Sequence, residues 1–148
     1  MVERRLTPER RLVVRGGRRG ADHAGRLVVL VIDDHVDSRD LMAAVLQELG
    51  VAIAEAGSGA EGLRRAARHP LPALIMVDLS LPDCHGTEVM RALKAGPETS
   101  DIPVVALSAS VTPADKAAAS AAGCTAFIEK PFLPDDVVAM VRRLLTGV

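Results

Sequence analysis

The sequence has almost no aromatic residues. Its 148 residues include no Trp or Tyr, and Phe127 and Phe132 are the only two Phe. The core must therefore be built from Val, Leu, Ile, Met and Ala. The same scarcity excludes proteins that bind single-stranded nucleic acid by stacking bases on aromatic side chains.

Cysteines and long apolar runs are also scarce. Cys84 and Cys124 are the only two cysteines, too few and too irregularly placed for a disulfide framework or a zinc knuckle. No apolar run approaches the roughly 20 residues of a membrane helix, and the first residues lack the apolar stretch of a secretory signal. These absences predict a cytoplasmic protein that does not enter a membrane.

The formal net charge is close to zero but unevenly distributed. The whole chain has a net charge of -1, whereas residues 1–26 carry eight Arg and three acidic residues. Residues 15–20 (Arg-Gly-Gly-Arg-Arg-Gly) mix glycine with charge and show no apolar periodicity. We therefore expect residues 1–25 to be a disordered basic arm and residues 26–148 to form one folded domain. The arm is a solvated tail or the product of a start codon assigned too early, or it contacts anionic surfaces or nucleic acid through nonspecific charge.

From residue 27 onward, short apolar runs alternate with amphipathic stretches. This alternation is typical of buried parallel strands connected by helices. The runs that predict strands are 27–32, 51–55, 73–77, 103–107 and 126–128. They predict an α/β domain of the (βα)5 type, a doubly wound parallel five-stranded sheet with helices on both faces.

Five helices are predicted between and after these strands. Leu41, Val45 and Leu49 recur at helical spacing before Gly50, which predicts the first helix. Ser58 stands three residues before Glu61, the spacing of a capping box. The other helices are predicted over residues 63–68, 87–95, 113–122 and 134–145, and Pro134, Asp135 and Asp136 suit the start of the last one.

Polar side chains follow four of the five predicted strands. Because ligands collect beyond the carboxyl ends of parallel strands, we expect these side chains to converge at one edge of the sheet. The second strand contributes nothing comparable. The converging residues are Asp33, Asp34, Asp78, Ser108 and Lys130.

This set of residues predicts a site for phosphoryl chemistry. The carboxylates of Asp33, Asp34 and Asp78 would repel one another unless a cation neutralised them, and Mg2+ is the expected ion. Mg2+ sites of this kind leave coordination positions open for phosphate oxygens. Lys130 supplies a cation for other phosphoryl oxygens, and Ser108 supplies a hydroxyl donor.

Over about residues 27–146 the sequence resembles the receiver domains of two-component response regulators, the CheY-like superfamily. The resemblance rests on four segments at successive strand ends. They are the acidic pair in residues 31–34, the loop of residues 78–86 (Asp-Leu-Ser-Leu-Pro-Asp-Cys-His-Gly), the hydroxyl residue in 106–108, and residues 127–131 (Phe-Ile-Glu-Lys-Pro). It implies a flavodoxin-like fold with strand order 2-1-3-4-5.

The resemblance also implies roles for individual residues. Asp78 would accept a phosphoryl group from the phosphohistidine of a histidine kinase or a histidine phosphotransfer protein. Asp33, Asp34 and Asp78 would hold Mg2+ together with the backbone carbonyl of Ser80, and Lys130 would pair with the phosphoryl group. The protein would then be a phosphoacceptor switch in a phosphorelay, catalysing only its own phosphorylation and dephosphorylation.

The switch itself is implied to involve three further positions. Ser108 would move toward the phosphoryl group, Phe127 would turn inward, and the Lys130–Pro131 peptide bond would be cis. A downstream protein would dock on the surface formed by residues 113–122, 126–128 and 134–145. Because the sequence ends at Val148, shortly after the last predicted helix, we expect no output domain on that side.

Several alternatives stay open at this point. A haloacid-dehalogenase-like phosphatase would have a similar fold, but it calls for an Asp-x-Asp motif and a cap insertion, whereas the sequence has Asp33-Asp34-His35 and only short loops. The chain could also be a detached receiver of a hybrid histidine kinase, or a receiver that acts only by interaction. His35 and His85 flank the site, but neither has a second ligand at a useful spacing, so both are predicted to be exposed loop or helix-start residues.

Overall fold

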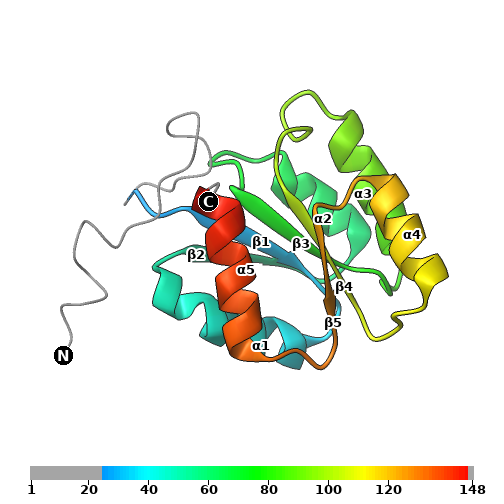
Figure 1. Ribbon diagram of the computed structural model, residues 1–148. Coiled ribbons are helices and arrows are strands. Elements are labelled where there is room, and N and C mark those ends of the chain that lie inside the picture. Colours follow the sequence, from blue (N-terminus) through cyan, green and yellow to red (C-terminus); the bar gives the residue numbers. More distant parts are fainter. Residues whose placement is uncertain (1–24, 147–148) are drawn as a thin grey trace.

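The computed structural model describes residues 25–146, and these form a parallel sheet between two layers of helices (Figure 1). The strand order is β2-β1-β3-β4-β5, which confirms the order 2-1-3-4-5. The expected disordered arm lies outside the described residues, except for Gly25. The strands are β1 (Val28–Ile32), β2 (Ala52–Ala56), β3 (Leu74–Asp78), β4 (Val104–Ser108) and β5 (Ala126–Glu129).

The helices alternate with the strands, as the sequence predicts. A short 3-10 helix, η3 (Gln47–Leu49), extends the first of them. The α-helices are α1 (Val36–Leu46), α2 (Gly59–Ala66), α3 (Gly86–Ala95), α4 (Pro113–Ala122) and α5 (Pro134–Thr146).

The two faces of the sheet are covered by different helices. Figure 1 shows α1 and α5 on one face and α2, α3 and α4 on the other. Successive strand residues point to opposite faces, so Val29 and Val31 pack with α1 and α5, whereas Leu30 and Ile32 pack with the other three helices. Because both faces are covered, the central strands β1, β3 and β4 are buried along their whole length and are apolar up to the polar residues at their carboxyl ends. The buried core consists of Val, Leu, Ile, Met and Ala, as expected from the lack of aromatic residues.

The buried face of α1 differs from the one that the apolar spacing suggests. Leu41 is 52% exposed, whereas Met42, Leu46 and Leu49 are buried. The core face therefore combines residues of two neighbouring apolar rows, and Leu41 at the start of the expected row lies outside it. Gly50 ends the segment with a φ of +71°, a left-handed conformation that glycine adopts without strain.

The start of α2 is fixed by side chains from two parts of the chain. The Ser58 hydroxyl accepts a hydrogen bond from the Glu61 N–H at 3.2 Å, as the capping-box spacing predicts, but the Glu61 carboxylate accepts from Gly57 N–H instead of Ser58 N–H. The Asp83 carboxylate, from the β3–α3 loop, accepts from the N–H groups of Gly59 and Ala60 at 2.8 and 3.0 Å. The loop that follows β3 is therefore anchored to α2.

Candidate functional site

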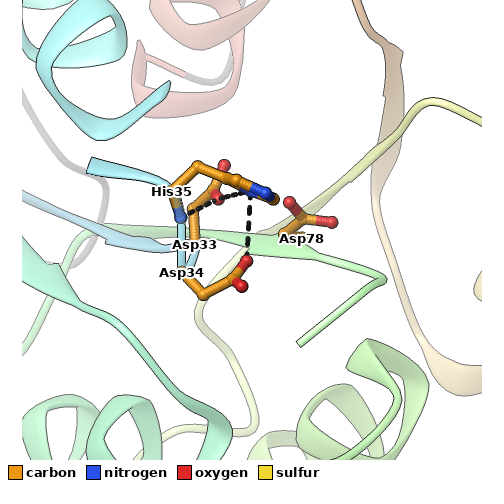
Figure 2. Close-up of side chains that lie close together, drawn as sticks. All are labelled: Asp33, Asp34, His35 and Asp78. Carbon is orange, nitrogen blue, oxygen red and sulfur yellow. Dashed lines mark hydrogen bonds and ion pairs between the residues drawn. The ribbon is translucent and has the colours of Figure 1, made fainter. Parts of the chain in front are cut away.

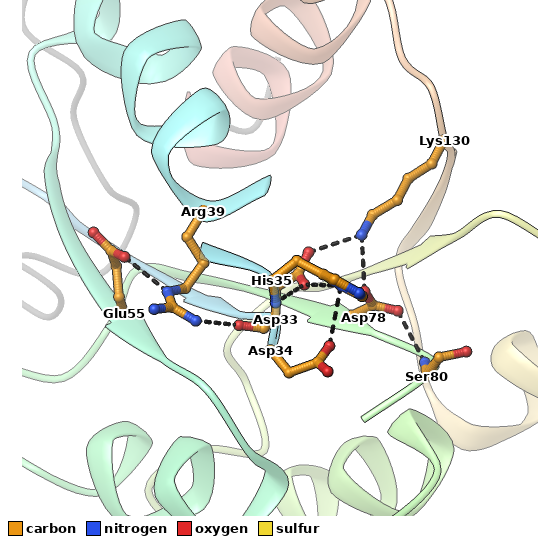
Figure 3. A network of polar contacts seen from close by, with 8 residues as sticks. All are labelled: Asp33, Asp34, His35, Arg39, Glu55, Asp78, Ser80 and Lys130. Carbon is orange, nitrogen blue, oxygen red and sulfur yellow. Dashed lines mark hydrogen bonds and ion pairs between the residues drawn. The ribbon is translucent and has the colours of Figure 1, made fainter. Parts of the chain in front are cut away.

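The ends of β1 and β3 place two buried carboxylates side by side. Ile32 and Val77 are partners in the sheet register, so Asp33 and Asp78 follow on adjacent strands. Asp33 is 1% exposed and Asp78 is 5% exposed. Lys130, just after β5, reaches across the edge and places its Nζ 2.8 Å from Asp33 Oδ2 and 2.8 Å from Asp78 Oδ2 (Figure 3). Three of the residues predicted for the site are thus in direct contact.

The two carboxylates have pKa values shifted in opposite directions. Burial raises the pKa of Asp33, but hydrogen bonds from Lys130 and from His35 outweigh it, so the pKa is lowered. For Asp78, burial dominates over the contacts with Lys130 and Ser80, and its pKa is raised. Burial disfavours the charged Lys130, yet hydrogen bonds with the two carboxylates raise its pKa. The half-buried Lys130 ammonium is therefore held charged between the two acids.

Asp34 is the third carboxylate of the site and lies nearer the solvent. Its side chain is 32% exposed, and its Oδ1 is 3.1 Å from His35 Nδ1. Asp33, Asp34, His35 and Asp78 each offer one possible ligand atom, and these atoms all lie within 4.8 Å of one another (Figure 2). The oxygen atoms of three carboxylates in this volume fit a hard divalent cation such as Mg2+.

The loop after β3 supports the Asp78 carboxylate. The Ser80 N–H donates to Asp78 Oδ1 at 2.9 Å, and Gly86 N–H donates to the Leu79 carbonyl at 2.9 Å. A Cβ at Gly86 would lie 2.7 Å from Leu79 Cα and overlap the Asp78 carbonyl oxygen. A glycine is therefore required where α3 begins against the end of β3. The role of the Ser80 carbonyl as a ligand stays a prediction.

The residues predicted for the switch lie on β4 and β5. Ser108 is buried at the end of β4, and its hydroxyl accepts from Ser110 N–H at 3.0 Å. Phe127, on β5, is half-buried against the core layer of α2, α3 and α4, and the Lys116 Nζ lies 6.0 Å from its ring centroid. The Lys130–Pro131 peptide bond is cis, as expected. Movement of Ser108 or Phe127 stays a prediction.

The contacts that two residues, Arg39 and His35, make at the site do not follow from the sequence. Arg39, on α1, donates from Nη1 to the Asp33 carbonyl and from Nε to Glu55 Oε1 at 2.6 and 2.8 Å. The second strand therefore supports the acidic pair indirectly, through Glu55. His35 was predicted to be an exposed helix-start residue, and it is one, but its ring also contacts the carboxylates of Asp33 and Asp34. Arg39 lies on a helix and Glu55 lies on a different strand, so no spacing in the sequence predicts that they meet.

Comparisons with known proteins identify the family. The model of the family described as response regulator receiver domain matches residues 29–142. The DNA-binding response regulator MtrA of Mycobacterium tuberculosis is 35% identical over 79% of this chain and 50% of its own length. The chain spans about half the length of the curated relatives it matches.

Two solved structures extend the comparison to the fold. The chemotaxis protein CheY4 of Vibrio cholerae is 27% identical, with a TM-score of 0.76 over 81% of this chain and 99% of that one. The receiver domain of a histidine kinase from Syntrophus aciditrophicus is 29% identical, with a TM-score of 0.75 over 82% and 91% of the two chains. Within residues 25–146, none of the helices has the length and apolar character needed to cross a membrane.

Proposed function

Because the chain belongs to the response regulator receiver domain family, we propose that Asp78 accepts a phosphoryl group from the phosphohistidine of a histidine kinase or a histidine phosphotransfer protein. The observation that carries this proposal is the buried Asp78 carboxylate, 2.8 Å from the Lys130 ammonium and beside two further acids. Phosphoryl transfer depends on positioning and on charge stabilisation, and this site supplies groups for both.

The chemistry assigned to Asp78 is nucleophilic displacement at phosphorus. One carboxylate oxygen attacks the phosphorus atom, the P–N bond to the donor imidazole breaks, and the imidazole leaves with the electron pair. The product is an acyl phosphate on Asp78. Lys130, which contacts Asp78, would pair with the phosphoryl oxygens, and the Ser80 N–H would orient the carboxylate through Oδ1.

Asp33, Asp34 and Asp78 would hold the Mg2+ ion on which such transfer depends, with the Ser80 carbonyl as the expected further ligand. When bound, Mg2+ neutralises charge on the transferring phosphoryl oxygens. Within residues 25–146, the chain contributes a set of three carboxylates and the single ammonium group of Lys130. Asp34 in particular has no contact with Lys130 and meets the ring of His35 instead, so its charge is available to a cation.

The phosphorylated state would be transmitted through β4 and β5. Ser108 would leave its Ser110 partner and move toward the phosphoryl group, and Phe127 would turn further into the core. The surface of α4, β5 and α5 would then change its affinity for a downstream protein. The half-buried position of Phe127, beneath Lys116 of α4, supports this route because the ring has room to gain burial.

The alternative that the chain is the receiver of a hybrid histidine kinase has one observation in its favour. The similarity to a receiver domain of a histidine kinase is as strong as that to CheY4, so the chain could equally serve as the receiver of a hybrid kinase. The phosphoryl chemistry at Asp78 is the same in both cases. The haloacid-dehalogenase-like alternative has no support from the comparisons, because the matched family is the receiver family.

Phosphorylation with a small donor tests the proposal directly. Acetyl phosphate with Mg2+ should add one phosphoryl group to the wild-type protein, and intact-mass spectrometry would detect it. Asp78→Asn keeps the shape of the side chain but removes the nucleophilic carboxylate, so it should abolish the added mass. Asp83→Asn is the matched control, since Asp83 lies in the same loop but contacts α2. Undiminished phosphorylation of the Asp78→Asn protein would refute the assignment.

Residues 1–25 are proposed to be dispensable for this function. Their composition offers little apolar surface to bury. A chain that begins at Gly25 should melt within about 2 °C of the full chain and accept phosphate at the same rate. A loss of several degrees, or of phosphorylation, would mean that the arm packs on the domain.

A further inference from the structure

Two histidines occupy corresponding positions in the loops after β1 and β3. His35 is the N-cap residue of α1, and His85 is the N-cap residue of α3. The His85 ring accepts a hydrogen bond from the Thr87 N–H at 3.2 Å, and the Glu88 carboxylate accepts from the His85 N–H at 3.2 Å. This ring therefore serves the helix start, as an N-cap side chain ordinarily does.

The His35 ring serves a different purpose. It makes no capping hydrogen bond to α1. Its Nδ1 lies instead 3.2 Å from Asp33 Oδ1 and 3.1 Å from Asp34 Oδ1, with the ring turned over the acidic site (Figure 2). Nδ1 and one oxygen atom of each of these two carboxylates lie within 4.8 Å of one another. The three atoms are thus close enough to bind one cation together.

We propose that His35 is an additional ligand of the divalent ion, binding through Nδ1, and that it raises the affinity of the site for transition metals that accept imidazole, such as Mn2+ and Co2+. The inference rests on the proposed metal site of Asp33, Asp34 and Asp78. Mg2+ prefers oxygen ligands, whereas imidazole nitrogen suits the first-row transition metals. His35 would therefore add affinity for these metals and little for Mg2+.

Binding of the ion through Nδ1 needs no other reactant. The Nδ1 lone pair is donated to the ion, and the ring proton is carried on Nε2. The ring can exchange protons with water because the His35 side chain is 65% exposed. The negative charges of Asp33 and Asp34 then face the metal.

Mn2+ is the probe for the test, because its electron spin detects bound nitrogen directly. Electron spin-echo envelope modulation on the full chain with Mn2+ should show imidazole nitrogen, and labelling only the histidines with 15N should change that modulation. His35→Asn should abolish it, and it should lower Mn2+ affinity about tenfold while changing Mg2+ affinity by less than about threefold. Asn is itself a favourable N-cap residue, so the start of α1 is preserved.

His85→Asn is the matched control, since it alters the corresponding N-cap in the neighbouring loop, and it should leave the histidine modulation intact. Bound Mn2+ without histidine modulation in the wild type would overturn the inference, as would modulation that survives in His35→Asn. Either result would leave phosphorylation of Asp78 with Mg2+ unaffected, so the proposed function would stand. If Mn2+ and Mg2+ both failed to bind, the inference and the metal site of the proposed function would fall together.

Discussion

The loops after β1 and β3 begin in the same way but treat their carboxylates differently. Asp33 and Asp78 are both buried at strand ends, and each lies 2.8 Å from Lys130 Nζ. Asp33 also accepts from the His35 N–H at 2.9 Å and contacts the His35 ring. Asp78 has one other donor, the Ser80 N–H. Their pKa values differ accordingly, lowered for Asp33 and raised for Asp78.

This difference shows how neighbouring carboxylates can acquire different chemistry. Burial raises the pKa of both Asp33 and Asp78, so it cannot explain why the two values differ. The separation comes from the local donors, and from the charge of Asp33, which adds to the raised pKa of Asp78. Asp33 is thereby kept ionised, as a metal ligand must be. Asp78 has fewer compensating contacts, so the arrival of a cation changes its environment most.

The largest expected effect comes from removing the cation that both loops share. In Lys130→Ala, Asp33 and Asp78 lose their common partner while both remain buried, so the free energy of unfolding in EDTA should fall by about 3 kcal/mol. Thermal melts would measure this as a loss of about 10 °C. Lys116→Ala, at an exposed lysine of α4, is the control and should change little. Equal melting temperatures for the two variants would show that the shared contact contributes nothing.

A smaller effect, opposite in sign for the two loops, is expected when each carboxylate is replaced by its amide. At pH 7 without metal, Asp33→Asn should lower the free energy of unfolding and Asp78→Asn should raise it, each by about 1 kcal/mol. The ionised Asp33 is favoured in the folded protein, whereas burial of the ionised Asp78 is unfavourable. Urea unfolding in EDTA would measure both changes.

The pH dependence of the same variants checks the signs. The pKa of Asp33 is lower in the folded protein than in the unfolded chain. Its contribution to the free energy of unfolding is therefore present above the unfolded pKa of about 3.9 and is lost as pH falls through the folded pKa. The pKa of Asp78 is higher in the folded protein than in the unfolded chain. Its contribution to the free energy of unfolding therefore increases as pH falls through the folded pKa toward the unfolded pKa of about 3.9. Asp78→Asn should remove that increase on acidification. Changes of the same sign in both variants would contradict the comparison.

The sequence predicts the sheet closely because its signal is local. Each predicted strand agrees with the observed one to within one residue at either end, since a parallel strand covered on both faces is an unbroken apolar run bounded by polar residues. Convergence of Asp33, Asp78 and Lys130 was also predictable, because the carboxyl ends of parallel strands meet at one edge. The sequence could not give the buried face of α1, where Leu41 and Met42 are equally apolar neighbours and only packing decides between them.

The charge balance within the site could be predicted only in part. Three carboxylates and one lysine imply a net negative site, in which neutralising either Asp33 or Asp34 would relieve repulsion. The contacts separate these two residues. Lys130 pairs with Asp33 and not with Asp34, and the His35 N–H adds a further donor to Asp33. Which acid a long lysine side chain reaches depends on three-dimensional geometry, so adjacent residues in the sequence can differ in this way.

The smallest effect on the metal-free protein is expected from Asp34→Asn. Asp34 is partly exposed and its only contact of this kind in residues 25–146 is the His35 ring, so the free energy of unfolding in EDTA should change by less than about 0.5 kcal/mol. The added stability from Mg2+ is RT ln(1 + [L]/Kd), about 1.4 kcal/mol at ten times Kd. In the variant this increment should largely disappear, because a ligand is lost while the fold is undisturbed. Thermal melts in EDTA and in millimolar Mg2+ separate the two quantities. An Asp34→Asn protein that kept the full Mg2+ increment would show that the acidic cluster does not bind the ion, and the contrast between Asp33 and Asp34 would then concern folding alone.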